Sequence, residues 1–274
     1  MKNKLFFNAA AIAAGIALLA GGFVFAAKTI TIKGSTTVLP ISQACAEVFM
    51  NQHEDIDISI QGGGSGVGIA SVIDGTADIG DASRPAKDKE YAKAKENGVD
   101  LYENVVALDG IAVIVHPTNT VGGLSKDQIK DIYTGKISNW KEVGGKDAKI
   151  VVVSRDSASG TFETFNDLAL DDEKVRPDAL LQASNQAVAQ TVSRTKGAIG
   201  YVGMGYLSDA VKGLEVNGVE PTKQNVVDGS YILARKLFMY TDGKPMGAVA
   251  EFINFVQSDD GQKLVEKQGF VPIK

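Results

Sequence analysis

Small hydroxyl and glycine residues follow three predicted strands, each at the point where a helix is expected to begin. They occupy loops 34–37, 61–68 and 155–161. The start of a helix has unpaired backbone N–H groups and the positive end of the helix macrodipole. Hydroxyls there supply further donors, and glycines let the backbone approach a ligand closely. Three such helix starts, brought together, would form a cage of neutral donors for an anion.

Arg155 is the one full positive charge within these loops. Its planar guanidinium suits two oxygens of a tetrahedral ion. A single loop of this kind is more often only a helix cap or a turn. The same pattern after three different strands favours an anion site. Loop 61–68 is not a nucleotide P-loop, because no Lys-Ser/Thr pair follows its glycines. The candidate anion-binding residues in the three loops are Ser35, Thr36, Thr37, Ser65, Arg155, Ser159, Gly160 and Thr161.

A fourth loop, 78–85, adds Asp81, Ser83 and Arg84 as candidates. A carboxylate repels anions, so an aspartate in an anion site is expected only if it interacts favourably with the ligand. Hydrogen phosphate carries an O–H that needs an acceptor, whereas sulfate at neutral pH carries none. An Asp81 carboxylate in the cage would therefore select phosphate over sulfate. The alternative is that Asp81 caps a turn or pairs with Arg84 at the surface.

The N-terminus has the layout of a cleavable secretory signal. Lys2 and Lys4 precede an apolar run over 5–25, which ends in small residues up to Ala26. This pattern predicts a signal peptide over 1–26 and a periplasmic mature protein. A retained membrane anchor is the alternative, because the run is nearly long enough to span a bilayer. No Cys follows the stretch 19–22, so we expect no lipid attachment.

The remaining composition excludes several classes of site. The formal net charge of −5 becomes −7 once Lys2 and Lys4 are removed, which argues against nucleic acid and means that an anion site must rely on local donors. Cys45 is the only cysteine, so no intramolecular disulfide forms, and its helical pattern predicts a buried thiol. Neither His53 nor His116 has Cys or acidic neighbours at ligand spacing, so we expect no metal and no cofactor.

Strand and helix patterns alternate along the chain, which predicts an α/β fold with a parallel sheet between helices. Two such units without a flexible tether favour two lobes around a ligand cleft, divided as 27–112, 113–228 and a return segment 229–274. The predicted strands are 29–33, 56–60, 77–80, 111–115, 150–153, 198–202 and 231–240. The predicted helices are 37–51, a short one ending at 73, 85–97, 125–133, 161–168 and a final one over 247–256.

At these loops the chain closely resembles the periplasmic phosphate-binding proteins of the high-affinity phosphate ABC transporter, over essentially the whole mature chain. The motifs that carry the resemblance are Gly34-Ser35-Thr36-Thr37-Val38, loop 61–68, segment 78–84, segment 124–140 with Asn139-Trp140, Arg155 with Ser159-Gly160-Thr161, segment 197–202 and Gly269-Phe270-Val271-Pro272.

The resemblance implies a hinged two-lobed fold (type II) that closes on dehydrated phosphate. Thr36 and Ser65 would donate from the first lobe, and Arg155, Ser159, Gly160 and Thr161 would donate from the second. The implied partners are inorganic phosphate and the permease subunits of an ABC transporter, and we expect the chain to be a monomer. In some members an Asp directly follows the Ser of the fourth loop, where this chain has Arg84. Asp81 could then be the acceptor, or Arg84 could pair with it.

Two other functions are alternatives to transport binding. A secreted serine hydrolase or phosphatase using Ser159 or Ser65 needs a base, and neither histidine lies in a recognisable partner motif. No Gly-x-Ser-x-Gly elbow surrounds either serine, so we expect no enzyme. A binding protein for sulfate, molybdate or another oxyanion differs only in the fourth loop and the size of the cage. That alternative stays open at the level of sequence.

Overall fold

The computed structural model describes residues 28–274. The predicted signal segment 1–26 lies outside these residues. Within them, no helix combines the length and apolar character needed to cross a membrane.

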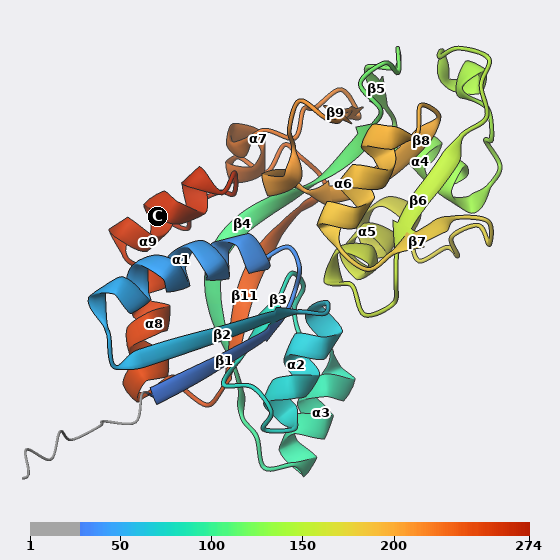
Figure 1. The fold of residues 1–274 in the computed structure, drawn as a ribbon. Helices are drawn as coiled ribbons and strands as arrows, with labels where there is room; N and C mark the ends of the chain where they lie inside the picture. Colours follow the sequence, from blue (N-terminus) through green and yellow to red (C-terminus); the bar gives the residue numbers. More distant parts are fainter. Residues whose placement is uncertain (1–27) are drawn as a thin grey trace, which may run out of the picture.

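A single mixed sheet of nine strands runs through the described part of the chain, in the order β2-β1-β3-β11-β4-β8-β6-β7 with β9 paired to β4 (Figure 1). The strands of its first half are β1 (Lys28–Gly34), β2 (Ile56–Gly62), β3 (Ile79–Ala82), β11 (Ala234–Asp242) and the first part of β4 (Leu101–Val115). β1, β2 and β3 are parallel, as the alternating strand and helix pattern predicts. β11 returns from the end of the chain and pairs antiparallel with both β3 and β4, so the sheet is mixed rather than purely parallel.

Helices cover both faces of this first half. α1 (Leu39–Gln52), α8 (Gly247–Gln257) and α9 (Asp259–Lys267) lie together on one face, where Ile30 and Ile32 of β1 are buried. α2 (Ser65–Ile73) and α3 (Asp88–Glu96) cover the other face. Alternate strand residues point to opposite faces, so β11 contributes Leu237 and Met239 to one hydrophobic core and Phe238 and Tyr240 to the other.

The second half of the sheet contains β8 (Ala198–Gly203), β6 (Val151–Arg155) and β7 (Leu180–Gln182). Its helices are α4 (Lys126–Thr134), α5 (Gly160–Leu170) and α6 (Asn185–Arg194). Tyr133, Phe165 and Tyr201 form its aromatic core, with the rings of Phe165 and Tyr201 stacked at 4.0 Å. The smaller elements are β5 (Gly123–Leu124), η1 (Trp140–Val143), η2 (Met204–Tyr206), β9 (Lys212–Gly213), β10 (Glu215–Val216) and α7 (Lys223–Val227).

β4 belongs to both halves of the molecule. It pairs with β11 up to Gly110 and with β8 from Ile111 onward. Figure 1 shows β4 and β11 running from the first lobe toward the second. The predicted strand 111–115 is therefore only the last part of a 15-residue strand, because the polar residues near its start hide the strand pattern. Three helices were also missing from the sequence prediction, α6, the short α7 (Lys223–Val227) and the terminal α9.

Close packing of glycines seats α2 directly on the strands. A Cβ on Gly68 would lie 2.6 Å from the carbonyl oxygen of Asp81, and one on Gly34 would lie 2.8 Å from the Cα of Gly68. No side chain fits at this contact. Gly68 of loop 61–68 thus has a packing role, and it holds the N-terminus of α2 beside the ends of β1 and β3.

Candidate anion-binding site

The structure brings the three predicted helix starts together. Ser65 is the first residue of α2, and its hydroxyl lies 3.2 Å from that of Ser83, just beyond β3. The Ser83 N–H also donates to Ser65 Oγ at 2.9 Å. Gly160, the first residue of α5, faces them from the other lobe, because a Cβ there would overlap Ser65 Oγ and lie 2.8 Å from Ser83 Oγ.

The start of α1 meets the start of α5 in the same region. Thr37 Oγ1 lies 2.9 Å from Thr161 Oγ1, and the N–H of Gly66 donates to the carbonyl of Ala158 at 3.1 Å. Both contacts join the two lobes. The predicted polar side chains are all buried, with exposed fractions of 6 % or less for Ser35, Thr36, Thr37, Ser65, Asp81, Ser83, Arg84, Arg155, Ser159 and Thr161. The lobes are therefore closed over this group of residues.

Two serines also have ordinary backbone roles. Ser35 Oγ accepts from the N–H groups of Thr37 and Val38 at 3.1 and 3.4 Å. Ser159 caps α5, since its Oγ accepts from the Phe162 N–H at 3.1 Å. In both cases the hydroxyl oxygen is used as an acceptor and the hydroxyl hydrogen remains available. The cap role and a donor role toward an anion are therefore compatible.

Arg155 is a buried cation without a carboxylate partner among residues 28–274. Its Nε donates to the carbonyl of Gln182 at 2.9 Å and its Nη2 to that of Ala183 at 3.1 Å. Nη1 is buried and has no protein partner. Burial lowers the pKa of Arg155, the neighbouring Asp156 carboxylate raises it in part, and the charge of Arg235 lowers it. Burying a charge without a counter-ion costs desolvation free energy, so a bound anion beside this guanidinium would be strongly favourable.

Arg235 is a second cation at the site, and sequence analysis missed it. Its Nε and Nη2 donate to Asp109 Oδ2 at 2.9 and 2.7 Å, and its Nη1 donates to the carbonyl of Ser83 at 3.2 Å. Nη2 also lies 3.1 Å from Thr161 Oγ1 and 3.3 Å from Thr37 Oγ1. The charge of Arg235 is balanced by Asp109. The sequence gives one hint of a buried role for Arg235, since it lies two residues before the apolar, buried part of β11.

Asn185 is a further residue that sequence analysis missed. It is the first residue of α6 and is fully buried. Its Nδ2 donates to Thr36 Oγ1 at 3.1 Å and to Thr37 Oγ1 at 3.0 Å, and its Oδ1 accepts from the Gly203 N–H at 3.2 Å. One amide thus links the start of α1 in the first lobe to β8 in the second.

The structure places the carboxyl group of Asp81 away from this cage. Its Oδ2 accepts from Ser42 Oγ at 2.6 Å on the side of α1, and its Oδ1 is buried without a partner. Burial raises the pKa of Asp81 to about 8, although the hydrogen bond from Ser42 lowers it in part. Asp81 is buried and its carboxyl group contacts Ser42, so it neither caps a turn nor pairs with Arg84, and both parts of that alternative were wrong.

Arg84 lies at the edge of the cage in an ion-pair cluster. Its Nη1 and Nη2 donate to the Glu90 carboxylate at 2.7 and 2.8 Å, and its Nε contacts Glu163 of α5. Lys87 Nζ also lies 2.8 Å from Glu163. Arg84 and Lys87 belong to the first lobe and Glu163 to the second. The positive charge of Arg84 is therefore balanced by the carboxylates of Glu90 and Glu163, and the pair with Glu163 joins the two lobes.

Comparison with known proteins identifies the family. The PBP superfamily domain matches residues 25–260 of this chain. The phosphate-binding protein PstS of Bacillus subtilis is 40% identical over 250 residues, which cover 90% of this chain and 82% of that protein. The PstS of Staphylococcus epidermidis is 36% identical over 253 residues, covering 87% and 77%. This chain belongs to the PstS phosphate-binding family of the PBP superfamily.

Solved structures of proteins from phosphate transport systems agree with this assignment. A putative phosphate ABC transporter substrate-binding protein from Clostridium perfringens, solved with bound phosphate, matches with a TM-score of 0.84 and 38% identity, over 90% of this chain and 100% of that one. An ABC-type phosphate transport receptor from Vibrio cholerae matches with a TM-score of 0.73 and 33% identity, covering 88% and 99%. The predicted two-lobed α/β fold and the family resemblance are confirmed. PstS proteins are binding proteins rather than enzymes.

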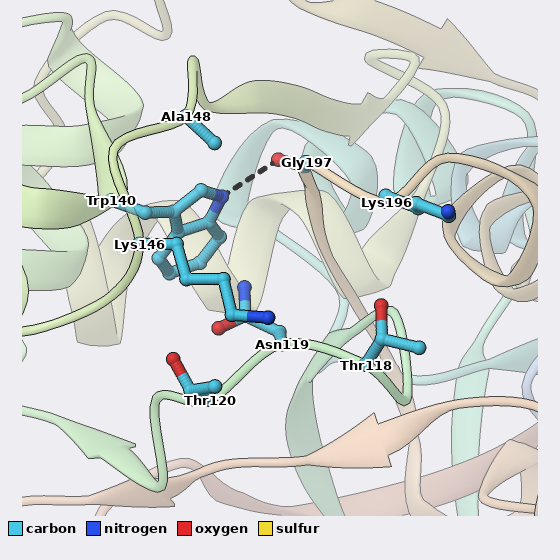
Figure 2. Close-up of a pocket in the computed structure, with 8 residues that line it drawn as sticks. All are labelled: Thr118, Asn119, Thr120, Trp140, Lys146, Ala148, Lys196 and Gly197. Carbon is cyan, nitrogen blue, oxygen red and sulfur yellow. Dashed lines mark hydrogen bonds between the residues drawn. The ribbon is translucent and has the colours of Figure 1, made fainter.

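A separate pocket of about 440 Å³ lies elsewhere in the second lobe and contains none of the predicted site residues. Trp140 and two lysines, Lys146 and Lys196, line it (Figure 2). The indole Nε1 of Trp140 donates to the carbonyl of Gly197 at 3.0 Å. Gly197 precedes β8, whereas Arg155 ends the neighbouring parallel strand β6, so Trp140 is remote from the anion cage. Within 28–274 no three His, Cys, Asp or Glu residues are grouped to hold a metal ion.

The buried carboxyl of Asp81 gives the stability of the protein a specific pH dependence. An unfolded aspartate titrates near pH ~4, whereas burial raises the pKa of Asp81 to about 8 in the folded protein. Between these values the folded state holds a proton that the unfolded state has released. The free energy of unfolding must therefore fall as pH rises through this window, by about 1.4 kcal/mol for each unit of pKa difference.

We expect Asp81→Asn to reduce the decrease in the free energy of unfolding with pH. The difference in stability between the variant and the unaltered protein should therefore shift in favour of the variant from pH 5 to pH 9. Urea unfolding at pH 5, 7 and 9 measures it, with the exposed Asp209→Asn as the control. Because Asp81 lies outside the cage, its variant should retain anion affinity. An unchanged slope of stability against pH would contradict a buried Asp81 carboxyl group with a raised pKa.

Gly160→Ala tests whether the two lobes meet at the candidate site. The added methyl would overlap Ser65 Oγ and crowd Ser83 Oγ across the cleft. We expect anion affinity to fall at least about tenfold with little change in the free energy of unfolding. Calorimetric titration measures the affinity. The matched control is Gly122→Ala, where a Cβ would have no atom within 4 Å. Equal affinities for the two variants would show that Gly160 does not border the site.

Proposed function

We propose that this chain captures inorganic phosphate between its two lobes outside the cytoplasm and delivers it to an ABC transporter. The observation that carries the proposal is Arg155 Nη1, a buried guanidinium nitrogen without a protein partner. No carboxylate forms a salt bridge with this arginine in the described part of the chain. A phosphate oxygen at Nη1 would supply both the missing acceptor and the missing negative charge.

The surrounding donors suit a dehydrated tetrahedral anion. The starts of α1, α2 and α5 bring their helix dipoles and the hydroxyl groups beside them to one place. We infer that Thr36, Ser65, Ser83, Thr161 and the backbone at Gly160 complete the cage. Ser35, Thr37 and Ser159 lie beside them at the same helix starts. Most of these donors are neutral, so the cage can enclose an anion in a protein whose overall charge is negative.

The choice of phosphate over other oxyanions rests on the family rather than on Asp81. The relatives from Bacillus subtilis and Clostridium perfringens are phosphate-binding proteins by name. The Asp81 carboxyl group contacts Ser42, so we leave it and Arg84 out of the set of groups that touch the anion. Selectivity against sulfate must then come from groups other than an aspartate in this loop.

Export and delivery to a transporter would complete this function. Residues 1–26 would direct export and be removed, leaving a periplasmic protein without a lipid anchor. The permease subunits of an ABC transporter would receive the ligand from a monomer. We infer lobes over 27–112 with 229–274 and over 113–228. The change of partner of β4 between Gly110 and Ile111 supports a division close to residue 112.

Arg155→Ala tests the proposal directly. A charge-assisted hydrogen bond contributes about 1.5–3 kcal/mol, so phosphate affinity should fall about tenfold or more. Calorimetric titration of phosphate-stripped protein with phosphate and with sulfate gives both affinity and selectivity. Arg194→Ala, which removes an exposed arginine at the end of α6, is the control. Unchanged phosphate affinity in Arg155→Ala would remove this residue from the site, and equal affinity for sulfate would broaden the ligand class.

A further inference from the structure

The hydroxyl groups of the cage are surrounded by donors from the protein side. A hydroxyl has one hydrogen to donate and two lone pairs that accept. Thr37 Oγ1 lies 3.0 Å from Asn185 Nδ2, 3.3 Å from Arg235 Nη2 and 2.9 Å from Thr161 Oγ1. The first two of these groups are donors only. Thr37 therefore has to accept from the protein.

The orientation of the Asn185 amide is fixed by a contact that its Oδ1 makes. This oxygen accepts from the Gly203 N–H at 3.2 Å. The opposite end of the amide, Nδ2, therefore faces the threonines and gives one hydrogen each to Thr36 and Thr37. The reversed amide would set its nitrogen against an N–H donor.

The pair formed by Thr37 and Thr161 is left with a hydrogen that no protein group accepts. Asn185 donates to Thr37, and Arg235 Nη2 donates toward both threonines. One threonine hydroxyl donates to the other at 2.9 Å. Whichever of the two is the donor, the second hydroxyl hydrogen has only donor groups of the protein around it. It needs an acceptor from outside the protein.

The hydroxyl hydrogen of Thr36 also lacks an acceptor from the protein. Thr36 Oγ1 accepts from Nδ2 of Asn185 at 3.1 Å and lies 3.4 Å from the Asn185 backbone N–H. No acceptor for its hydroxyl hydrogen lies within hydrogen-bond distance among residues 28–274. Thr36 is almost fully buried, so bulk water does not supply this acceptor freely.

We propose that Asn185 and Arg235 are positioning residues of the anion site. From outside the cage, they donate into the threonine oxygens and so turn the hydroxyl hydrogens of Thr36 and of the Thr37–Thr161 pair toward the anion. This wall of the cage then only donates. It stabilises ligand oxygens that carry negative charge and has no lone pair for a protonated one. The proposal rests on the proposed function, because it assigns the same cage as the anion site.

A double-mutant cycle tests whether Asn185 acts through the Thr36 hydroxyl. Thr36→Val removes the hydroxyl at nearly constant volume, and Asn185→Ala removes the amide that orients it. Inorganic phosphate is the probe, and calorimetric titration of the full chain gives its affinity. We expect each single variant to lose about tenfold in affinity, since a hydrogen bond to a charged ligand is lost. The double variant should lose much less than the product of the two losses, because both changes remove one interaction.

Two controls make the cycle specific. In the first, Asn185→Ala is combined with Ser159→Ala. These two residues share no hydrogen bond, so the fold-losses in phosphate affinity should multiply. If Asn185→Ala does not fold, the nearly isosteric Asn185→Leu replaces it, because it removes the amide without adding a charge or a new hydrogen-bond acceptor. Losses that multiply for Asn185 with Thr36 in a chain that binds phosphate would overturn the positioning role alone. No phosphate binding by the unaltered chain would instead contradict the proposed function.

Discussion

A buried guanidinium without a counter-ion is the constraint on which the rest of this structure depends. Arg155 makes two hydrogen bonds to carbonyl groups, and these neutralise no charge. Asp109 already balances the second buried cation, Arg235. A closed, unliganded cleft would hold one uncompensated positive charge, which is unfavourable in a low-dielectric interior. An anion removes this penalty, so ligand binding and closure of the lobes stabilise one another.

The fold supplies neutral donors around that charge with little help from other cations. Gly34 and Gly68 let α2 approach the strands so closely that its first residue, Ser65, reaches the end of β3. The opposite lobe presents the start of α5 in the same way, and Gly160 has no side chain that would separate the lobes. Arg84, Lys87 and Glu163 place an ion-pair cluster beside the contact. Closure thus joins surfaces whose polar groups are matched across the cleft.

The sequence predicts the parts of the site that are local. Ser35, Thr36, Ser65, Ser159 and Thr161 each lie just after a strand at a helix start, and the carboxyl ends of parallel strands gather at one edge of a sheet. The strand and helix alternation also predicts most of the elements. The Ser125 capping box is one example, because its Oγ accepts from the Gln128 N–H at 3.1 Å as the pattern indicates.

The parts that sequence analysis missed depend on distant segments or on strand register. Asn185 and Arg235 enter the site only because β4 and β11 cross between the lobes, which no local pattern reveals. The position of Asp81 depends on strand parity, since successive residues point to opposite faces and a shift of one residue reverses the direction. Its carboxyl group faces Ser42 rather than the cage. The sequence predicts a return segment over 229–274 but not the antiparallel pairing of β11 with β3 and β4, because pairing between distant segments leaves no local pattern.

A crystal structure of the purified protein with bound phosphate tests this arrangement of the site most directly. We expect phosphate enclosed between the starts of α1, α2 and α5, with one oxygen within about 3.2 Å of Arg155 Nη1. We also expect the hydroxyls of Thr36 and Thr161 at similar distance from other phosphate oxygens. Phosphate bound elsewhere, for example at the Trp140 pocket, with Arg155 Nη1 paired to a protein group, would contradict this arrangement.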